Sequence, residues 1–180
     1  MTQQLLSSDT VRLRPMEASD LPLIYKLEND TRLWNTAANT QPLSRSTIEK
    51  YIGASTGDIY KDGQLRLIIE FKSLSVQEFK SIGVIDLIDF SPRHQRAEVG
   101  ISILPEYQSQ RIGTEALRLM EQYAAQVLFI HQLYAYVSPD NEISLRLFIS
   151  AGYQRVGALQ DWLKTSEGYG HILLFQKIFC

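Results

Sequence analysis

Apolar and charged residues alternate from Thr10 to Pro15, the first segment of the chain with a regular pattern. This two-residue period is typical of a half-buried strand. Apolar residues then recur at three- and four-residue steps from Leu21 to Glu28 and again from Ser44 to Ala54, which predicts two amphipathic helices. Asp20 precedes the first of them as a candidate N-cap. The chain is therefore expected to open with a strand and two helices.

Short runs of β-branched and other apolar residues predict six further strands. In chain order these are Leu65–Phe71, Ile82–Ile88, Ala97–Leu104, Leu133–Val137, Tyr153–Leu159 and Ile172–Ile178. The polar stretch SLSVQEFKS makes the first two a hairpin with a long connection. The polar stretch DWLKTSEGYGH is expected to be a loop between the last two.

Two more helices are predicted, over Arg111–Phe129 and Ile143–Ile149, because apolar residues recur there at helical spacing. The resulting order is neither the regular βα alternation of a doubly wound fold nor an all-β sandwich. It predicts an α+β (mixed α/β) fold, with a mixed and largely antiparallel sheet covered by helices. No repeat or linker divides the chain, so residues 1–180 are expected to form a single domain.

Composition narrows the classes of function. The chain is 44% hydrophobic and 21% charged with a formal net charge of −2, which argues against a dedicated nucleic-acid surface. One cysteine, Cys180, excludes an internal disulfide framework, and the three histidines have no metal-ligand spacing. The N-terminal residues lack a signal-peptide pattern, and no apolar run is long enough to span a membrane. A cytoplasmic protein without a bound metal is the expectation.

The stretch PEYQSQRIGTEA, Pro105–Ala116, leads from a predicted strand into a predicted helix. A helix start presents unpaired N–H groups and a partial positive charge, so a polar loop there can hold a phosphate. An ordinary capped helix start is the alternative. The expected donors are Ser109, Gln110, Arg111, Gly113 and Thr114.

These residues resemble the signature of the GNAT superfamily of acyl-CoA-dependent N-acyltransferases, in its spermidine and ribosomal-protein N-terminal acetyltransferase branch. That signature places Gln or Arg, two residues, Gly, one residue, and Gly or Ala between a strand and a helix, and Gln108–Gly113 stand in its frame. A second stretch, DNEISLRLFISAGYQRVG, matches the family's Asn, small residue, Leu, aromatic and Gly pattern from Asp140 to Gly157. Two motifs in the right order are far more specific than either alone.

The resemblance implies a single acyl-CoA N-acyltransferase domain built on a sheet of six to seven strands. About four helices should flank the sheet, which should splay between the strand ending at Leu104 and the strand LYAYV. The cofactor, acetyl-CoA, should lie in this gap. The resemblance and the helix-start argument together assign coenzyme A binding to Ile103, Leu104, Gln108, Ser109, Gln110, Arg111, Ile112, Gly113, Thr114, Asn141, Ser144 and Phe148. Asn141 and Asp140 are also good helix N-caps, so capping remains an alternative reading of Asn141.

Two positions depart from the family pattern. Arg111 stands where the family has its central Gly, which lets the backbone approach phosphates closely. A helical backbone at Arg111 would preserve the N–H donor, and its guanidinium could then reach a cofactor phosphate. Phe148 stands where many members carry a Tyr that protonates the departing thiolate, and a phenyl ring has no proton to give. Ser144 and Tyr136 are the alternative proton donors.

Glu98 is the best candidate for the base that deprotonates an acceptor ammonium, because it lies on the strand that leads to the predicted cofactor loop. Asp86 in the preceding strand is the second candidate, and Asp89 and His94 are weaker ones. The alternative for Glu98 is an exposed strand carboxylate paired with Arg93 or Arg96. The expected activity is transfer of an acetyl group from acetyl-CoA directly to a primary amine. A catalytically weak or inactive acyl-CoA-binding protein is the alternative function.

The acceptor class is left open. A polyamine-like small molecule would need several carboxylates, and Glu28, Asp30, Glu49, Glu98 and Asp161 are available. A protein N-terminus would need a groove flanked by Trp34 and the segment DWLKTSEGYG, although Trp34 could instead cover the core. A homodimer or larger homo-oligomer is possible, with the C-terminal strand pairing either within the chain or with a partner.

Overall fold

Seven strands form one mixed sheet in the computed structural model, which describes residues 5–31, 41–73, 78–165 and 167–179. The strands are β1 (Val11–Pro15), β2 (Leu65–Phe71), β3 (Lys80–Ser91), β4 (Arg96–Ile103), β5 (Gln132–Val137), β6 (Gln154–Thr165) and β7 (Gly168–Ile178). Their order across the sheet is β1-β2-β3-β4-β5-β7-β6. The predicted fold class and strand number are confirmed.

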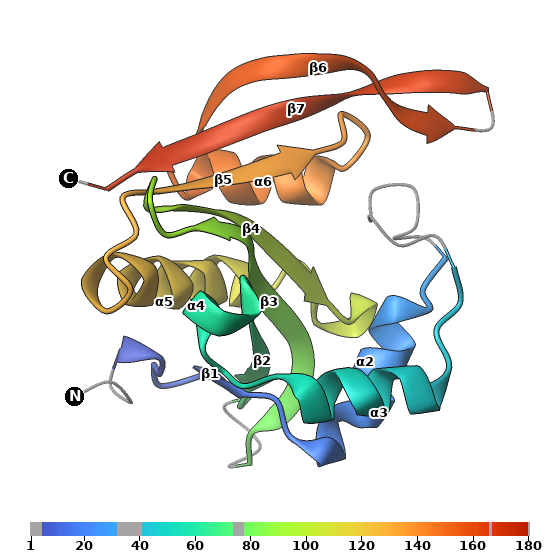
Figure 1. Cartoon of the computed structure of the whole chain (residues 1–180), viewed down its shortest axis with the longest axis vertical. Helices are drawn as coiled ribbons and strands as arrows, with labels where there is room; N and C mark the ends of the chain where they lie inside the picture. The colour runs from blue at the N-terminus through green and yellow to red at the C-terminus, as the bar shows by residue number, and fades with distance from the viewer. Residues whose placement is uncertain (1–4, 32–40, 74–77, 166, 180) are drawn as a thin grey trace.

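The sheet forks between β4 and β5, which are its one parallel pair among the described strands. Pairing is confined to three positions, Arg96–Glu98 against Gln132–Tyr134. Beyond these positions β4 continues to Ile103 and β5 to Val137, but the two strands no longer pair with each other. Figure 1 shows them separating. The expected splay is therefore present, and it begins just after Glu98.

Helices cover both faces of the sheet (Figure 1). They are α2 (Leu21–Glu28), α3 (Arg45–Ala54), α4 (Ile59–Asp62), α5 (Ile112–Gln126) and α6 (Glu142–Ser150), with short 3-10 turns at Ala18–Asp20 and Pro105–Tyr107. Helix α4 was not predicted, because four residues are too few to show helical periodicity. Its ends carry clear local signals: the Asp58 side chain caps it, and Gly63 ends it with a left-handed φ of 67°.

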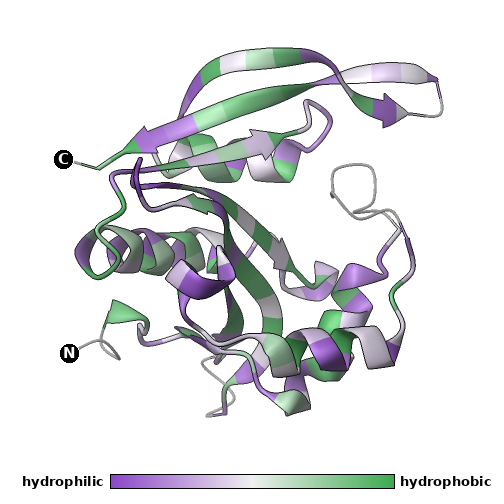
Figure 2. Ribbon diagram, viewed as in Figure 1, coloured by the Kyte–Doolittle hydropathy of each residue, from purple (hydrophilic) through white to green (hydrophobic). Residues whose placement is uncertain are grey.

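Two hydrophobic clusters show which helix covers which face. Helix α5 packs on one face through residues such as Leu117 and Met120, both 0% exposed, and Phe148 of α6 joins the same cluster. Helices α2 and α3 pack on the other face through Ile24 and Ile48. Figure 2 shows that hydrophobic residues dominate the central strands between these helices. The sheet thus separates a cluster under α5 and α6 from one under α2 and α3.

The prediction of a loop over DWLKTSEGYGH is wrong. Strand β6 runs to Thr165 and β7 begins at Gly168, so the two form a long hairpin that crosses the top of Figure 1. Strand β6 is an edge strand with mostly exposed side chains, so it lacks the apolar alternation that marks a half-buried strand. Strand β7 pairs with β5 and β6 of the same chain.

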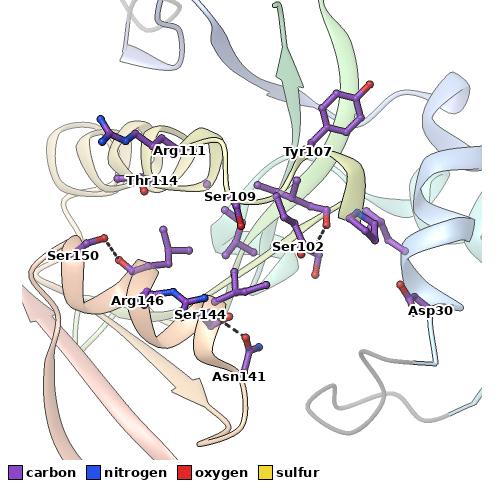
Figure 3. Close-up of a pocket in the computed structure, with 18 residues that line it drawn as sticks. Asp30, Ser102, Tyr107, Ser109, Arg111, Thr114, Asn141, Ser144, Arg146 and Ser150 are labelled. Atoms are coloured by element: carbon purple, nitrogen blue, oxygen red, sulfur yellow. Dashed lines mark hydrogen bonds between the residues drawn. The ribbon is translucent and has the colours of Figure 1, made fainter.

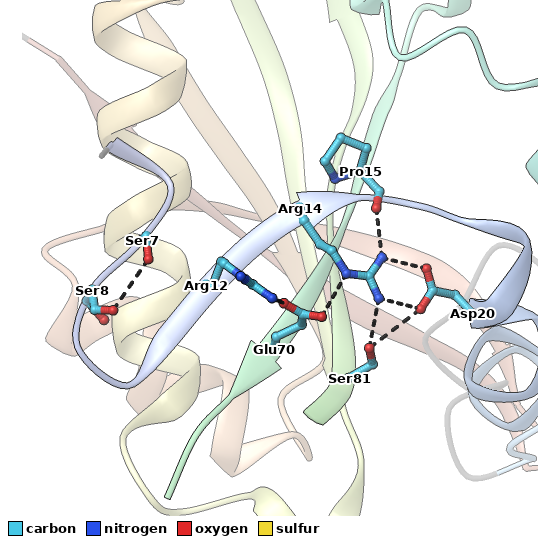
Figure 4. Close-up of polar contacts among 8 residues, drawn as sticks. All are labelled: Ser7, Ser8, Arg12, Arg14, Pro15, Asp20, Glu70 and Ser81. Carbon is cyan, nitrogen blue, oxygen red and sulfur yellow. Dashed lines mark hydrogen bonds and ion pairs between the residues drawn. The ribbon is translucent and has the colours of Figure 1, made fainter. Parts of the chain in front are cut away.

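Asp20 does not cap α2, although it precedes the helix as predicted. Its carboxylate is 3% exposed and instead accepts hydrogen bonds from Nη1 and Nη2 of Arg14, each at 2.7 Å. Arg14 Nε also donates to Glu70 at 2.7 Å (Figure 4). Burial alone would raise the Asp20 pKa, but the hydrogen bonds from Arg14 and from the Glu17 N–H outweigh it and lower that pKa. This network ties β1 and β2 to the start of α2.

Candidate active site

A cavity of about 910 Å³ lies at the fork of the sheet, between β4, the start of α5, α6 and the end of α2 (Figure 3). It brings together eight of the predicted cofactor-binding residues: Ile103, Gln108, Ser109, Arg111, Gly113, Thr114, Asn141 and Ser144. These residues come from two segments of sequence that are far apart. The cavity thus unites the two motifs that the sequence analysis singled out.

Four other predicted cofactor residues do not line this cavity. Leu104, Ile112 and Phe148 are buried in the core, with Phe148 4% exposed and its ring set edge-on to that of Tyr153, centroid to centroid 5.0 Å. Gln110 is exposed, and its side-chain Nε2 donates to the backbone carbonyl of Glu106 at 3.0 Å. The three buried side chains therefore belong to the hydrophobic core, and the Gln110 side chain stabilises the loop before α5.

The loop before α5 has an unusual backbone. Ser109 and Arg111 have φ values of 62° and 63°, in the left-handed region, and α5 begins only at Ile112 with Arg111 as its N-cap. The expectation that Arg111 is helical is therefore wrong. A left-handed residue beside a helix start directs successive N–H groups toward one point, which forms a concave anion site. Glycine adopts this conformation without cost, which accounts for the family's preference at this position.

Asn141 and Ser144 lie at the start of α6 on the opposite side of the cavity. Asn141 is the N-cap, and its Oδ1 accepts a hydrogen bond from the Ser144 N–H at 3.0 Å. Figure 3 shows both side chains beside the cavity. Capping and lining the cavity are therefore not alternatives for Asn141: it does both.

Several lining residues were missed by the sequence analysis. They are Leu27, Ile101, Ser102, Pro105, Tyr107, Ile143, Arg146, Leu147 and Ser150. A signal for some of them was present, because Ser144, Leu147 and Ser150 recur at three-residue steps and so share a helix face. Residues from α2 and from the turn at Tyr107 carried no such signal, since only the tertiary fold brings them to the cavity.

Charges are segregated along the cavity. Arg111 and Arg146 come from the α5 and α6 side, whereas Asp30 lies at the other end, beyond α2 (Figure 3). Arg146 Nη1 also donates to Glu142 at 2.9 Å, one turn earlier on α6. Such an arrangement favours an anionic group at one end and a cationic group at the other.

Glu98 lies on β4 near the base of the fork and is half-buried. Burial, followed by the nearby charge of Asp89, raises its pKa to about 7. Gly100 and Ser102 share its face of β4 because alternate residues point the same way, and Ser102 lines the cavity. Space is open where a Cβ on Gly100 would lie. Glu98 is not itself among the residues that line the cavity; it lies on the same strand and face as Ser102, which does.

The other predicted acceptor-site residues are dispersed. Glu28 accepts a hydrogen bond from Arg66 at 2.5 Å, while Glu49 and Asp161 are exposed on α3 and β6. Tyr136 does not line the cavity, and its ring stacks on Trp162 with centroids 6.3 Å apart. Trp34 lies outside the described residues. Of the five carboxylates predicted for a polyamine, the structure therefore places Asp30 at the cavity and Glu98 on the strand beside it.

Two absences hold for the described part of the chain. Its His, Cys, Asp and Glu side chains form no group of three that could hold a metal ion. None of its helices is both long and apolar enough to cross a membrane.

Comparison with known proteins gives a consistent result. The model of the acetyltransferase (GNAT) domain matches residues 10–154. Spermidine N(1)-acetyltransferase of Escherichia coli (strain K12) is 27% identical over 157 residues, which cover 85% of this chain and 77% of the relative. The structure of spermidine N-acetyltransferase from Vibrio cholerae in complex with CoA and spermine superposes with a TM-score of 0.82 at 21% sequence identity. The match covers 95% of this chain and 96% of the Vibrio cholerae chain. For ribosomal-protein-S5-alanine acetyltransferase from Vibrio fischeri the TM-score is 0.79 at 18% identity, with 96% and 94% covered.

Proposed function

Because the chain belongs to the GNAT acetyltransferase family, a class of acetyl-CoA-dependent N-acetyltransferases, we propose that it acetylates a primary amine directly, in a ternary complex at the sheet fork. One observation carries the proposal. The same cavity is bounded by the left-handed loop at the start of α5 and, at its other end, by Asp30, and it lies against β4, the strand that carries Glu98 with a pKa raised to about 7.

The cofactor fits the groups around the cavity. We assign its pyrophosphate to the N–H groups of the loop from Ser109 to Thr114, with the Thr114 hydroxyl as a further donor. The Asn141 cap uses the side-chain oxygen, which leaves the Nδ2 group to donate to an amide carbonyl of the pantetheine arm. Acetyl-CoA supplies an acetyl group activated as a thioester.

Glu98 acts as the base in this proposal. Its pKa of about 7 matches the requirement of a general base that works near neutral pH. It takes a proton from the acceptor ammonium and leaves a neutral amine, the form that can attack a carbonyl carbon. Glu98 lies on the face of β4 that leads to the cavity, so the proton is removed beside the reacting atoms.

The backbone of β4 polarises the carbonyl. Leu104 N–H donates to Ile82 on β3 at 2.9 Å, and successive strand residues direct their N–H groups to opposite edges. The Ile103 N–H therefore faces the fork, where it can donate to the acetyl oxygen as negative charge develops. Gln108 Nε2 donates to the Ile103 carbonyl at 2.8 Å, which holds the next peptide group, between Ile103 and Leu104, at the end of β4.

Ser144 is the group we assign to protonate the departing sulfur. It lines the cavity, whereas Tyr136 does not and Phe148 has no proton to donate. A thiol with a pKa of roughly 8.5 is a tolerable leaving group at neutral pH, so the proton donor contributes less than the base does.

Amine acetylation with acetyl-CoA tests this function. Purified protein is incubated with acetyl-CoA and a panel of primary amines, including polyamines, aromatic monoamines and peptides with free N-termini, while free thiol is recorded. Amine-dependent thiol release is expected for at least one class. Calorimetric binding of CoA with no thiol release for any amine would instead support the inactive acyl-CoA-binding alternative.

The oligomeric state is a separate prediction. The sequence analysis left a homodimer or larger homo-oligomer open; we propose that copies of the chain associate, and we place the contact at the exposed edge strand β6. Light scattering on the same preparation measures the mass in solution, and a mass of one chain would contradict the prediction.

Substituting Arg111 separates its backbone role from its charge. Arg111→Gly is expected to raise the free energy of unfolding by about 1 kcal/mol, because glycine adopts a left-handed φ without strain. Arg111→Ala keeps that strain, so its stability should match the parent. If the guanidinium holds a phosphate, both variants should bind CoA about tenfold more weakly by calorimetry. Unchanged affinity in both would show that Arg111 contributes only its backbone.

A further inference from the structure

A hydrogen bond crosses β4 at the position of Glu98. Tyr134 on β5 donates from its hydroxyl to Asp89 Oδ2 on β3 at 2.5 Å. Strand β4 lies between these two strands, and Glu98 pairs with Ile88 on one side and with Tyr134 on the other. The Tyr134–Asp89 contact therefore joins the two arms of the fork directly beside Glu98.

The backbone of β3 is distorted so that Asp89 can make this contact. The β3–β4 register shifts between Ile88 and Ser91, and Asp89 itself has a left-handed φ of 49°. A regular strand would alternate Ile88 and Asp89 between opposite faces. A bulge re-aims a side chain, and here it brings the Asp89 carboxylate toward the face that carries Glu98 and Tyr134.

The charges around Glu98 single out Asp89. Titratable and charged groups on the neighbouring elements are Glu28 on α2, Arg66 on β2, Asp86 and Asp89 on β3, Arg96 at the start of β4, Tyr134 and Tyr136 on β5, and the exposed Arg93 and His94 at the β3–β4 turn. Arg66 binds both carboxylate oxygens of Asp86, at 2.7 and 3.0 Å. Arg66 also binds Glu28, at 2.5 Å, so one guanidinium is shared by two carboxylates away from Glu98. Asp89 instead accepts its hydrogen bond from the Tyr134 hydroxyl, and it is the carboxylate that acts on Glu98.

We propose that Tyr134 and Asp89 are positioning residues for the base: Tyr134 fixes the Asp89 carboxylate beside Glu98, and the fixed charge keeps Glu98 a strong enough base to deprotonate the acceptor ammonium. This inference rests on the proposed acetyltransferase function and deepens it. Two carboxylates then divide the work: Asp89 supports the base, and Glu98 exchanges the proton. Burial contributes most of the raised Glu98 pKa and Asp89 the remainder, so removing Asp89 should reverse part of the shift.

The pH profile of kcat/KM tests the proposal. In the parent, kcat/KM should rise through about pH 7 as Glu98 ionises. Asp89→Asn should move this midpoint about one pH unit toward acid and lower the alkaline plateau about threefold, since a less basic group removes protons more slowly. Tyr134→Phe keeps the ring but frees the Asp89 carboxylate, so its midpoint should move in the same direction. The double variant should add little to Asp89→Asn alone.

Matched controls and a second measurement keep the outcomes distinct. Asp9→Asn and Tyr169→Phe alter exposed residues of the same types and should leave the midpoint in place. Carbon-13 NMR of labelled glutamate carboxyls, with the Glu98 signal assigned by its loss in Glu98→Gln, reports the same midpoint without turnover. Active parent enzyme with an unmoved midpoint in both variants would overturn the positioning role alone. A parent inactive with every amine would overturn the proposed function, while the NMR titration would still decide whether Asp89 sets the basicity of Glu98.

Discussion

Glu98→Gln is expected to lower kcat/KM for the acceptor amine by about 10²- to 10⁴-fold at pH 8, the range that removal of a general base typically costs. Glutamine has nearly the same shape as glutamate but cannot take the proton from the ammonium. The affinity for CoA should be unchanged, because Glu98 is not among the residues assigned to the cofactor. Steady-state thiol release and calorimetry measure the two quantities on the same preparation.

The activity of the parent should also depend on pH in a definite direction. Glu98 must be ionised to act as a base, so activity of the parent should rise with pH through the Glu98 pKa of about 7. The ordinary value is 4.5, and the folded state therefore binds more protons than the unfolded state between these two values. The Glu98 contribution to stability thus falls as pH rises through this window. Glu98→Gln should then be at least as stable as the parent at pH 8, and urea unfolding of the variant checks that lost activity does not come from unfolding.

A control and a contradictory outcome are both available. Glu167→Gln makes the same chemical change at an exposed position at the β6–β7 turn and should leave kcat/KM within a factor of two or so of the parent. A Glu98→Gln variant that retains more than about a tenth of the parent activity, with the same pH profile, would remove Glu98 from the mechanism.

Arg14→Met is expected to lower the free energy of unfolding by about 3 to 5 kcal/mol, the usual cost of removing one partner from a buried ion pair. Methionine retains an apolar stem but leaves Asp20, 3% exposed, and Glu70, 6% exposed, without the guanidinium that joins them. Ser81 also loses its hydrogen bond from Arg14 Nη2, at 2.9 Å (Figure 4). Urea unfolding followed by circular dichroism measures the change.

Arg12→Met is the matched control, since Arg12 contacts the same Glu70 carboxylate from the neighbouring side. Its side chain is 44% exposed, and an exposed pair is worth about 1 kcal/mol or less. We therefore expect a loss several times smaller than that of Arg14→Met, with the same dependence on urea concentration. Equal losses would mean that burial of Asp20 and Glu70 does not decide the strength of this network.

The elements nearest the cofactor loop were predicted well. Strand β4 and helix α5 have strong and opposite periodicities, so the loop between them was located from sequence to within a residue or two. Asn141 was identified from local sequence too, because a polar residue that can cap a helix precedes an amphipathic helical pattern there. Local sequence controls these features because backbone hydrogen bonding and side-chain burial act over only a few residues.

Other features of the site had no local signal. The left-handed backbone at Arg111 was missed because, in a sequence, glycine is the residue that indicates such a conformation, and an arginine does not. Strand β6 was missed in part because an exposed edge strand lacks apolar alternation. The contact between Tyr134 and Asp89 joins residues 45 positions apart, and neither residue is unusual in its own segment.

The sequence by itself determined the order of the strands and of the longer helices, the family, and the two segments assigned to the cofactor, since each of these follows from periodicity or from a short motif. Only the tertiary structure decided how far β4 and β5 part, which carboxylates reach the cavity, and which charge lies beside Glu98. The physical reason is the distance along the chain over which each interaction acts. Helices, strands and caps are set by neighbours along the chain, whereas the pKa of Glu98 depends on burial and on an aspartate from another strand, both of which exist only after the sheet has assembled.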